Sequence, residues 1–338
     1  MAGRGVCKEV VDEFYPISIV EKEQILNICC EKQIDGVCTI ASDVAAPTVA
    51  YVAEQLGLTG NTYHAAVLAN NKFLMREAFT KAGVLCPTYH RVTSIAEIPY
   101  KNIFPLIVKP TDRFGSLGIT KVENQDNLQQ AMSTALDCSF KKEAVIEEYI
   151  EGREISVEFI SYHGKNYPLQ ITNKVTTGAP HFVELEHHQP ADLNEEQYTR
   201  IYALTEKALN ALGITNGASH SEYKITADGR IVVMEIGARM GGDFIGSNLV
   251  QLSTGYDFVK GVIQVALGEF EEPKFGEKKH AGVYFLCEET KDLFSIIKEA
   301  RLSQIICAEI TDSELRSVTC SANRSGCLIY QDNKRLVL

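Results

Sequence analysis

The sequence predicts an α/β protein in which helices and strands alternate along the chain. Residues 21–33 have apolar positions at helical spacing, and a short apolar run at 36–41 fits a buried parallel strand. A second helix through 49–58 completes the alternation that is typical of a doubly wound domain. Further along, strands interleaved with helices indicate a small α/β subdomain, and Asp228-Gly229 between two alternating apolar runs predicts a β-hairpin.

Length, composition and charge exclude several classes of protein. At 338 residues the chain is long enough for two or three domains, and its composition is that of an ordinary soluble protein. The formal net charge of −11 argues against a general nucleic-acid surface but is compatible with a local phosphate site. The first residues lack a signal-peptide pattern and no apolar run is long enough to cross a bilayer. We therefore expect a cytoplasmic protein with neither a membrane nor a nucleic-acid partner.

The ten cysteines are scattered along the chain and form no CxxC pair. In a long chain without a signal peptide this pattern indicates reduced thiols, mostly buried, rather than a disulfide framework. The spacing needed for a tetrahedral zinc site is also missing.

The N-terminal elements begin weakly and then become clear. Residues 1–14 show little pattern, so the strand and glycine turn that usually open a doubly wound domain are not visible. Asn61 or Thr62 caps one helix, and a second helix over 70–83 ends at Gly83.

The rest of the chain has a regular series of predicted elements, with a polar, glycine-containing loop at 111–119 leading into one of the strands. The strands are expected at 86–92, 105–110, 144–150, 152–161 and on both sides of the hairpin turn, with further short ones in 280–338. The helices are expected at about 125–137, 195–213, 257–268 and 290–299.

Two carboxylates on the predicted hairpin are the strongest functional signal. The hairpin can place Glu222 and Glu235 side by side at the same end. Two converging carboxylates are costly unless a cation lies between them. Just beyond them, Arg239 and the pair Gly241-Gly242 supply a fixed positive fork and open backbone N–H groups. Together these residues indicate a magnesium-phosphate centre more than a structural hairpin.

Other candidate residues have an ordinary reading beside the functional one. Lys109 ends a strongly apolar strand and could reach phosphate as a point charge, whereas Lys72, one turn into a helix, is by itself a typical surface lysine. The loop Gly115-Ser116-Leu117-Gly118 could fold over phosphates through its N–H groups, although loops with two glycines are common. The segment Glu147-Glu148-Tyr149-Ile150 is either an acidic strand edge or a contact to adenine and ribose.

The segment 180–191 gathers Glu184, Glu186, His187 and His188. It fits a solvated loop, a metal site or a loop that contacts substrate. Adjacent histidines on a regular strand point to opposite faces and cannot both face one ion, which favours the substrate-contact loop over the metal site.

Taken in their order along the chain, these segments resemble the ATP-grasp superfamily of carboxylate–amine ligases. The resemblance runs from about residue 20 to the end of the chain. The motifs are NNKFLMREAFTKAGV, PLIVKPTDRFGSLGI, VIEEYIEGREISVEF, GASHSEYKI and EIGARMGGD. FVELEHHQPA, the GASH segment, RMGGD and LVQLSTGYD are similar to the branch of amino-acid ligases that joins two amino acids. The carbamoyl-phosphate synthase large subunit and formate-dependent phosphoribosylglycinamide transformylase are more distantly similar.

The resemblance implies an ATP-grasp fold with a shortened doubly wound domain, a lid and a mixed sheet. The expected boundaries are 1–86 for the N-terminal domain, 87–150 for the lid subdomain, 151–270 for the catalytic subdomain and 271–338 for an extension packed on it.

The resemblance also implies a role for each matching residue. Arg239 would steady the carboxylate substrate and the charge that develops on it. Glu222 and Glu235 would hold two Mg²⁺ ions, which Mn²⁺ can replace. The residues expected to contact substrate are Glu184, His187, Gly241 and Gly242. Those expected to contact ATP are Lys72, Lys109, Gly115, Ser116, Gly118, Glu147, Glu148, Tyr149, Ile150 and Glu154.

The activity implied is ATP-dependent ligation of a carboxylate, through an acyl phosphate, to an amine, with a homodimer as a possible assembly. Two alternatives remain open at this point: a carboxylase or carbamoylating ligase that uses bicarbonate, and a nucleotide-binding protein that has lost its chemistry. One departure stands out, because most of the superfamily has an asparagine two residues after the second metal carboxylate, and this chain has Gly237.

Overall fold

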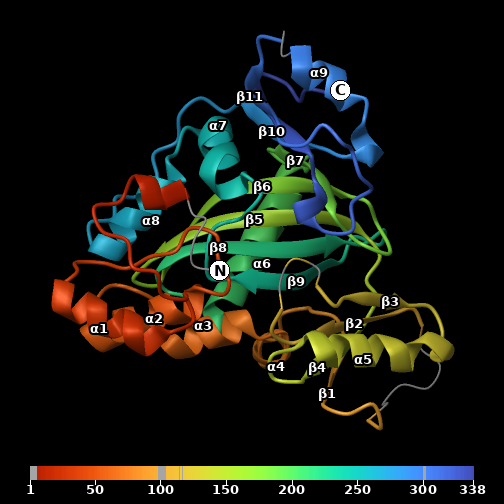
Figure 1. Ribbon diagram of the computed structural model, residues 1–338, viewed down its shortest axis with the longest axis horizontal. Helices are drawn as coiled ribbons and strands as arrows, with labels where there is room; N and C mark the ends of the chain where they lie inside the picture. The colour runs from red at the N-terminus through yellow and green to blue at the C-terminus, as the bar shows by residue number, and fades with distance from the viewer. Residues whose placement is uncertain (1–5, 98–103, 114, 116, 300–301) are drawn as a thin grey trace.

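A central antiparallel sheet of eight strands organises the computed structural model, which describes residues 6–97, 104–113, 115, 117–299 and 302–338 (Figure 1). The strand order is β11-β12-β10-β7-β6-β5-β8-β9, and every neighbouring pair is antiparallel, where the sequence predicted a mixed sheet. The strands are β5 (Arg153–Tyr162), β6 (Lys165–Thr176), β7 (Glu184–Gln189), β8 (Gly217–Ile225), β9 (Ile231–Gly237), β10 (His280–Leu286), β11 (Ile305–Ile310) and β12 (Gly326–Asp332).

A second, smaller sheet lies beside the first and has its own apolar core (Figure 1). Its order is β1-β4-β2-β3, and α5 (Leu128–Cys138) packs on it through Met132 and its neighbours. The strands are β1 (Tyr89–Val92), β2 (Leu106–Pro110), β3 (Thr120–Val122) and β4 (Ala144–Glu148). Because the small sheet and α5 have a separate core, they form a distinct layer next to the site described below.

The N-terminal segment is helical, and its described residues before Tyr89 contain no strand. Its helices are α1 (Lys22–Lys32), α2 (Ala46–Leu56), α3 (Tyr63–Asn70) and α4 (Lys72–Ala82). The strand predicted at 36–41 is therefore wrong. This run lies against the end of α8, where a Cβ on Gly36 would come within 2.6 Å of the Ala266 carbonyl. A single backbone bond, from Met240 N to Ile40 O at 2.9 Å, ties it to the segment after β9.

The predicted helices are confirmed, and the sequence accounts for their ends. Thr62 caps α3, and Asn71 caps α4, which Gly83 ends in the left-handed conformation at φ +65°. The remaining helices are α6 (Glu195–Leu212), α7 (Val250–Thr254), α8 (Phe258–Leu267) and α9 (Leu293–Glu299). Short turns of helix are η1 (Val6–Glu9), η2 (Gln125–Asn127), η3 (Ile245–Leu249), η4 (Glu288–Thr290) and η5 (Ser321–Asn323).

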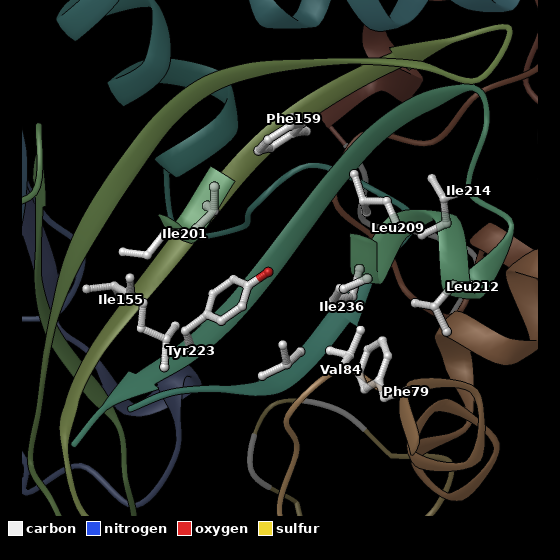
Figure 2. Packing of buried hydrophobic residues seen from close by; sticks show 14 of the residues in the cluster. Phe79, Val84, Ile155, Phe159, Ile201, Leu209, Leu212, Ile214, Tyr223 and Ile236 are labelled. Carbon is white, nitrogen blue, oxygen red and sulfur yellow. The ribbon is translucent and has the colours of Figure 1, made fainter. Parts of the chain in front are cut away.

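The main apolar core lies between the large sheet and the helices α4 and α6 (Figure 2). Every second residue of β5, namely Ile155, Val157 and Phe159, enters this core, as does Tyr223 of β8. The residues between them face the other side of the sheet. That other face therefore carries Glu154 and Glu158 of β5, and helix α8 covers one end of it.

Two β-bulges decide which acidic side chains share that other face. In β9, Glu222 pairs with Glu235 while Tyr223 pairs with Val233, so Met234 is an extra residue. Without it, the alternation from Val233 would turn Glu235 toward the core. In β7 the extra residue is Leu185, and it places Glu184 on the same face as His187.

The hairpin turn differs by one residue from the prediction. Gly229 N donates to Thr226 O at 2.9 Å, so Ala227 and Asp228 are the central residues of the turn. Gly229 follows in the left-handed region at φ +81°, which glycine adopts without strain. The predicted side-by-side placement of the two strands is confirmed.

The nine cysteines whose side chains the structure describes are all free thiols. Only Cys287 and Cys327 of these nine are buried, so the prediction of mostly buried thiols is wrong. Among the described residues, no helix combines the length and the apolar character needed to span a membrane.

Candidate active site

Two adjoining cavities lie between the small sheet and the face of the large sheet that points away from α6. One measures about 280 Å³ and the other about 150 Å³. They share five lining residues, Ile119, Lys174, Glu184, Glu222 and Glu235. The larger cavity is rich in charged groups, and the smaller one is walled largely by apolar side chains. The two acidic residues of the hairpin therefore stand at the junction of a polar and an apolar compartment.

Each acid of the hairpin has a lysine partner. Glu222 and Glu235 are directly opposite in the register of β8 and β9. Lys72 Nζ, from the start of α4, is 2.8 Å from Glu235 Oε1 and also donates to Arg113 O at 2.7 Å. Lys174 Nζ, from β6, donates to Glu222 Oε1. Lys72, expected from the sequence, and Lys174, which was missed, thus hold the acid pair together.

The charges around Glu222 keep it ionised. Burial by itself would raise the pKa of Glu222, but Lys174 and His220 outweigh that effect and hold the pKa well below its usual range. Burial would also lower the pKa of His220, yet Glu158 raises that pKa to about 9. Glu158 accepts from His220 Nδ1 and, at 2.9 Å, from Gly241 N. Alternating positive and negative groups thus form a series, namely Lys174, Glu222, His220 and Glu158. Nothing in the sequence indicated this series.

Lys109 is positioned by a buried ion pair. Its Nζ is 2.7 Å from Glu147 Oε2, and Glu147 is also 2.8 Å from Arg76 Nε. Burial would raise the pKa of Glu147, but Arg76 and Lys109 lower it below its ordinary value. Glu147 is 1% exposed and lines neither cavity, so its contact with adenine stays a prediction. It instead holds Lys109, which does line the smaller cavity.

We expect Glu147→Gln to lower the free energy of unfolding by about 3–5 kcal/mol, because it leaves two buried cations without a carboxylate. Chemical denaturation measures this loss. Glu143→Gln is the matched control, since Glu143 pairs with the half-exposed Arg91 on the same small sheet and should cost less than about 1 kcal/mol. Equal losses in the two variants would contradict the structural role of Glu147.

The smaller cavity is an apolar slot between the two sheets. Ile107 of β2 and the linker residues Tyr149 and Ile150 form one wall, and Met234 of β9 forms part of the other. Glu154 lines the slot and is 3.1 Å from Lys224. The structure thus brings three residues expected at the nucleotide together, namely Tyr149, Ile150 and Glu154. Glu148 instead accepts from Thr88 N and does not line the slot.

The glycine loop after β2 divides into two parts. Gly115 lines the larger cavity. Gly118, at φ +74°, packs against α5, where a Cβ would lie 2.9 Å from Cys138 Cβ. Packing against α5 therefore explains why position 118 is a glycine, without a contact to phosphate. Ser116 lies outside the described residues.

The part of the larger cavity next to β7 combines two expected residues with two that were missed. Glu184 and His187 line it together with Asp243. Arg324, from the segment before β12, is 3.2 Å from Glu184 Oε2 and 2.8 Å from Asp243 Oδ2. Burial lowers the pKa of His187, which stays neutral, and its Nδ1 has no hydrogen-bond partner among the described residues. His187 thus carries a buried, unpaired polar atom on a side chain that lines the cavity. Such an atom is available to a substrate, as expected for this segment.

Arg239 also lines the larger cavity. Its Nε and Nη2 donate to Asp43 Oδ1 and Oδ2 at 2.8 and 2.6 Å, and its Nη1 donates to Met240 O at 3.0 Å. Gly242 lines the cavity, and its missing side chain leaves open space. Position 241 requires glycine for a different reason, because a Cβ there would lie 2.8 Å from His220 Nδ1. Asp43 is 196 residues before Arg239 and gave no signal in the sequence.

The acid pair fits a divalent cation. Two carboxylates face one cavity from opposed strand positions, and hard cations such as Mg²⁺ prefer oxygen ligands and retain waters. Within the described part of the chain, no group of three or more His, Cys, Asp or Glu side chains is arranged to hold a metal. For such an ion Glu222 and Glu235 would supply oxygens, and phosphate or water would supply the others.

Comparison with known proteins agrees with this geometry. Residues 102–247 match the family described as the ATP-grasp domain. The matched range of the ATP-grasp domain contains Lys109, Lys174 and both acids of the hairpin, whereas Lys72 and Asp43 precede it.

Relatives of the ATP-grasp domain include several ligases. Alanine–anticapsin ligase of Bacillus subtilis strain 168 is 30% identical over 245 residues, which cover 65% of this chain and 51% of that protein. D-alanine–D-alanine ligase of Geobacillus thermodenitrificans is 27% identical over 215 residues, 57% of each protein. The chain thus spans about half the length of the curated relatives it matches.

Solved structures extend the similarity to nearly the whole chain. L-amino acid ligase from Bacillus licheniformis has a TM-score of 0.79 at 25% identity, covering 95% of this chain and 85% of that one. Phosphoribosylglycinamide synthetase from Anaerococcus prevotii, at 20% identity, has a TM-score of 0.73, covers 97% and 85%, and shows the fold alone. The ATP-grasp fold predicted from the sequence is confirmed.

Proposed function

We propose that this protein is an ATP-dependent ligase that activates a carboxylate as an acyl phosphate and joins it to an amine. The observation that carries the proposal is the junction of the two cavities. There, an apolar slot of a size and polarity suited to a base meets two acids, two lysines and an arginine. Relatives named as ligases of alanine and of L-amino acids support an amino acid as the activated carboxylate.

The slot would orient ATP so that its phosphates reach the larger cavity. Ile107, Ile150 and Met234 would cover the base, and Glu154 would accept from the ribose hydroxyls. Lys109 and Lys72 would then meet the phosphates as positive charges. Glu222 and Glu235 would hold Mg²⁺, which neutralises charge on the phosphates when it is bound.

A carboxylate cannot release oxide, and it therefore needs a better leaving group before an amine can attack. Its oxygen attacks the γ-phosphorus of ATP, which breaks the bond to ADP and forms an acyl phosphate. The amine then attacks the acyl carbon, and phosphate leaves with the bonding pair. Arg239 offsets the charge that develops on the carboxyl oxygen, and the enclosing small sheet keeps water from the acyl phosphate.

Phosphate release over the twenty amino acids, singly and in pairs, tests the proposal. We expect release that depends on an amino-acid pair, with ADP and a dipeptide mass appearing in equal amounts. A parallel series with bicarbonate tests the alternative of a carboxylase or carbamoylating ligase. Release that requires bicarbonate and no amino-acid pair would refute the amino-acid ligase.

We expect His187→Ala to change the preference among amino acids by about tenfold or more, while the KM for ATP changes by less than about threefold. The reason is that His187 lines the larger cavity and does not line the slot. Ratios of kcat/KM for competing amino acids provide the measurement. His188→Ala is the matched control, because His188 faces the other side of β7 and bonds Tyr330. A large loss of ATP binding in His187→Ala would contradict this placement.

A further inference from the structure

Arg239 is held more firmly than a residue that only needs to contact substrate. Both carboxylate oxygens of Asp43 accept from one edge of its guanidinium, at 2.8 and 2.6 Å. The side chains of Asp43 and Arg239 are 11% and 15% exposed, and both line the larger cavity. Burial would lower the pKa of Arg239, but Asp43 raises it above its ordinary value. The arginine therefore stays charged and keeps one orientation.

A guanidinium has five N–H groups, of which these contacts use only some. Asp43 takes one from Nε and one from Nη2, and the Met240 carbonyl takes one from Nη1 at 3.0 Å. One N–H on each terminal nitrogen remains, and Asp43 does not occupy the edge of the planar group between Nη1 and Nη2. That edge has the geometry for a second carboxylate or for the oxygens of an acyl phosphate.

Gly237 makes room for this arrangement. A Cβ at position 237 would lie 2.7 Å from Asp43 Oδ1, 3.1 Å from Arg239 Nε and 3.2 Å from Arg239 Cζ. Gly237 has no positive φ angle, so conformational freedom does not explain the glycine. Any side chain there would displace the carboxylate, the guanidinium or both.

We propose that Asp43 is a positioning residue for the ligation reaction and that Gly237 is its steric partner. Asp43 fixes one edge of Arg239 so that the other edge meets the reacting carboxyl group. This inference rests on the proposed function, because it assigns a step in that reaction. It also gives the N-terminal segment a part in the site, since Asp43 lies in the turn just before α2.

Steady-state kinetics of Asp43→Asn is the central test. The amide keeps the size but offers one acceptor oxygen in place of two, and its NH₂ group would face a guanidinium N–H. Misplacement of a reacting contact can cost about 10²-fold in rate. We expect kcat to fall by about that factor while the KM for ATP changes less than about threefold. Asp35→Asn is the matched control, because Asp35 is an exposed acid on the same segment. Gly237→Ala should reproduce the loss of kcat, since its Cβ meets the same carboxylate.

A double variant separates positioning from general support of the fold. If Asp43 acts through Arg239, Asp43→Asn combined with Arg239→Lys should be no slower than Arg239→Lys alone. Losses that multiply would overturn the proposal, and so would Asp43→Asn with a kcat within about threefold of the native value. Thermal unfolding of each variant identifies any that fails to fold, and Asp43→Glu then serves as the second variant.

The side-chain NMR signal of Arg239 gives a readout independent of turnover. In ¹⁵N-labelled protein we expect the Arg239 Nε–H to be protected from exchange in the native chain and unprotected in Asp43→Asn. A native chain without amino-acid-dependent turnover would overturn the proposed function. In that case, an unchanged Arg239 signal in Asp43→Asn would overturn the positioning role as well, and its loss would support it.

Discussion

Glu235→Ala should abolish turnover and leave the fold intact. Glu235 supplies one of the two carboxylates for Mg²⁺, and loss of a metal's charge stabilisation is worth several kcal/mol, about 10³-fold or more in kcat. The metal-free protein should still fold but lose some stability, because Glu235 is the carboxylate partner of the buried Lys72. Two features limit this loss: the change removes a like charge directly opposite Glu222, and Lys72 keeps its bond to Arg113 O. Phosphate release and chemical denaturation in the presence of a chelator measure the two effects separately.

A ligand-binding readout sharpens this first test. Mg²⁺ with ATP should raise the Tm of the native protein, and the rise should shrink in Glu235→Ala. Glu206→Gln, an exposed acid on α6, is the control and should behave as the native protein does. Near-normal turnover of Glu235→Ala at raised magnesium concentration would refute the metal assignment.

Arg239→Lys should lower kcat by about 10²–10³-fold with little change in the KM for ATP. Lysine keeps the positive charge but cannot present two parallel N–H groups to a carboxyl group. The loss is therefore one of geometry, of the size found when one donor to a developing oxyanion is removed. Single-turnover measurements should place it in the formation or use of the acyl phosphate.

Arg200→Lys, on the exposed side of α6, is the corresponding control and should keep native kinetics. A kcat for Arg239→Lys within about fivefold of the native value would show that charge alone suffices. That result would remove the reacting contact assigned to Arg239.

The parts of the fold that follow local rules could be predicted from the sequence. Helix α4 has a capping Asn71 and a terminal Gly83, so its limits were clear. The hairpin of β8 and β9 has alternating apolar residues and a glycine turn, and the two acids were therefore placed correctly. In each case the deciding residues lie within a few positions of one another.

The strands β6 and β7 were missed, and in β7 polar side chains, two of them lining a cavity, replace the usual apolar pattern. In β7 five of six residues are Glu, His or Gln, which is typical of a loop. The bulges at Leu185 and Met234 add to the difficulty, since each shifts the alternation by one residue. A pattern search with a strict period of two fails at such positions.

The ion pairs of the site were beyond reach for a different reason. Lys174 and Glu222 are 48 residues apart, and Asp43 and Arg239 are 196 apart. Neither Lys174 nor Asp43 lies in a distinctive local motif, and tertiary folding alone brings each to its partner. Glu147 illustrates the same limit, because its acidic strand end suggested a ligand contact and gave no sign of the buried pair that it forms with Arg76.

The bulge in β9 sets a fixed length scale inside the site. It turns two consecutive side chains, Met234 and Glu235, to the same face, where Met234 lines the apolar slot and Glu235 lines both compartments. The distance from the slot wall at Met234 to the shared boundary at Glu235 is therefore set by one peptide unit, whose geometry scarcely varies. A ligand that fills both compartments must match this rigid span in length. Loop motion elsewhere leaves the span unchanged.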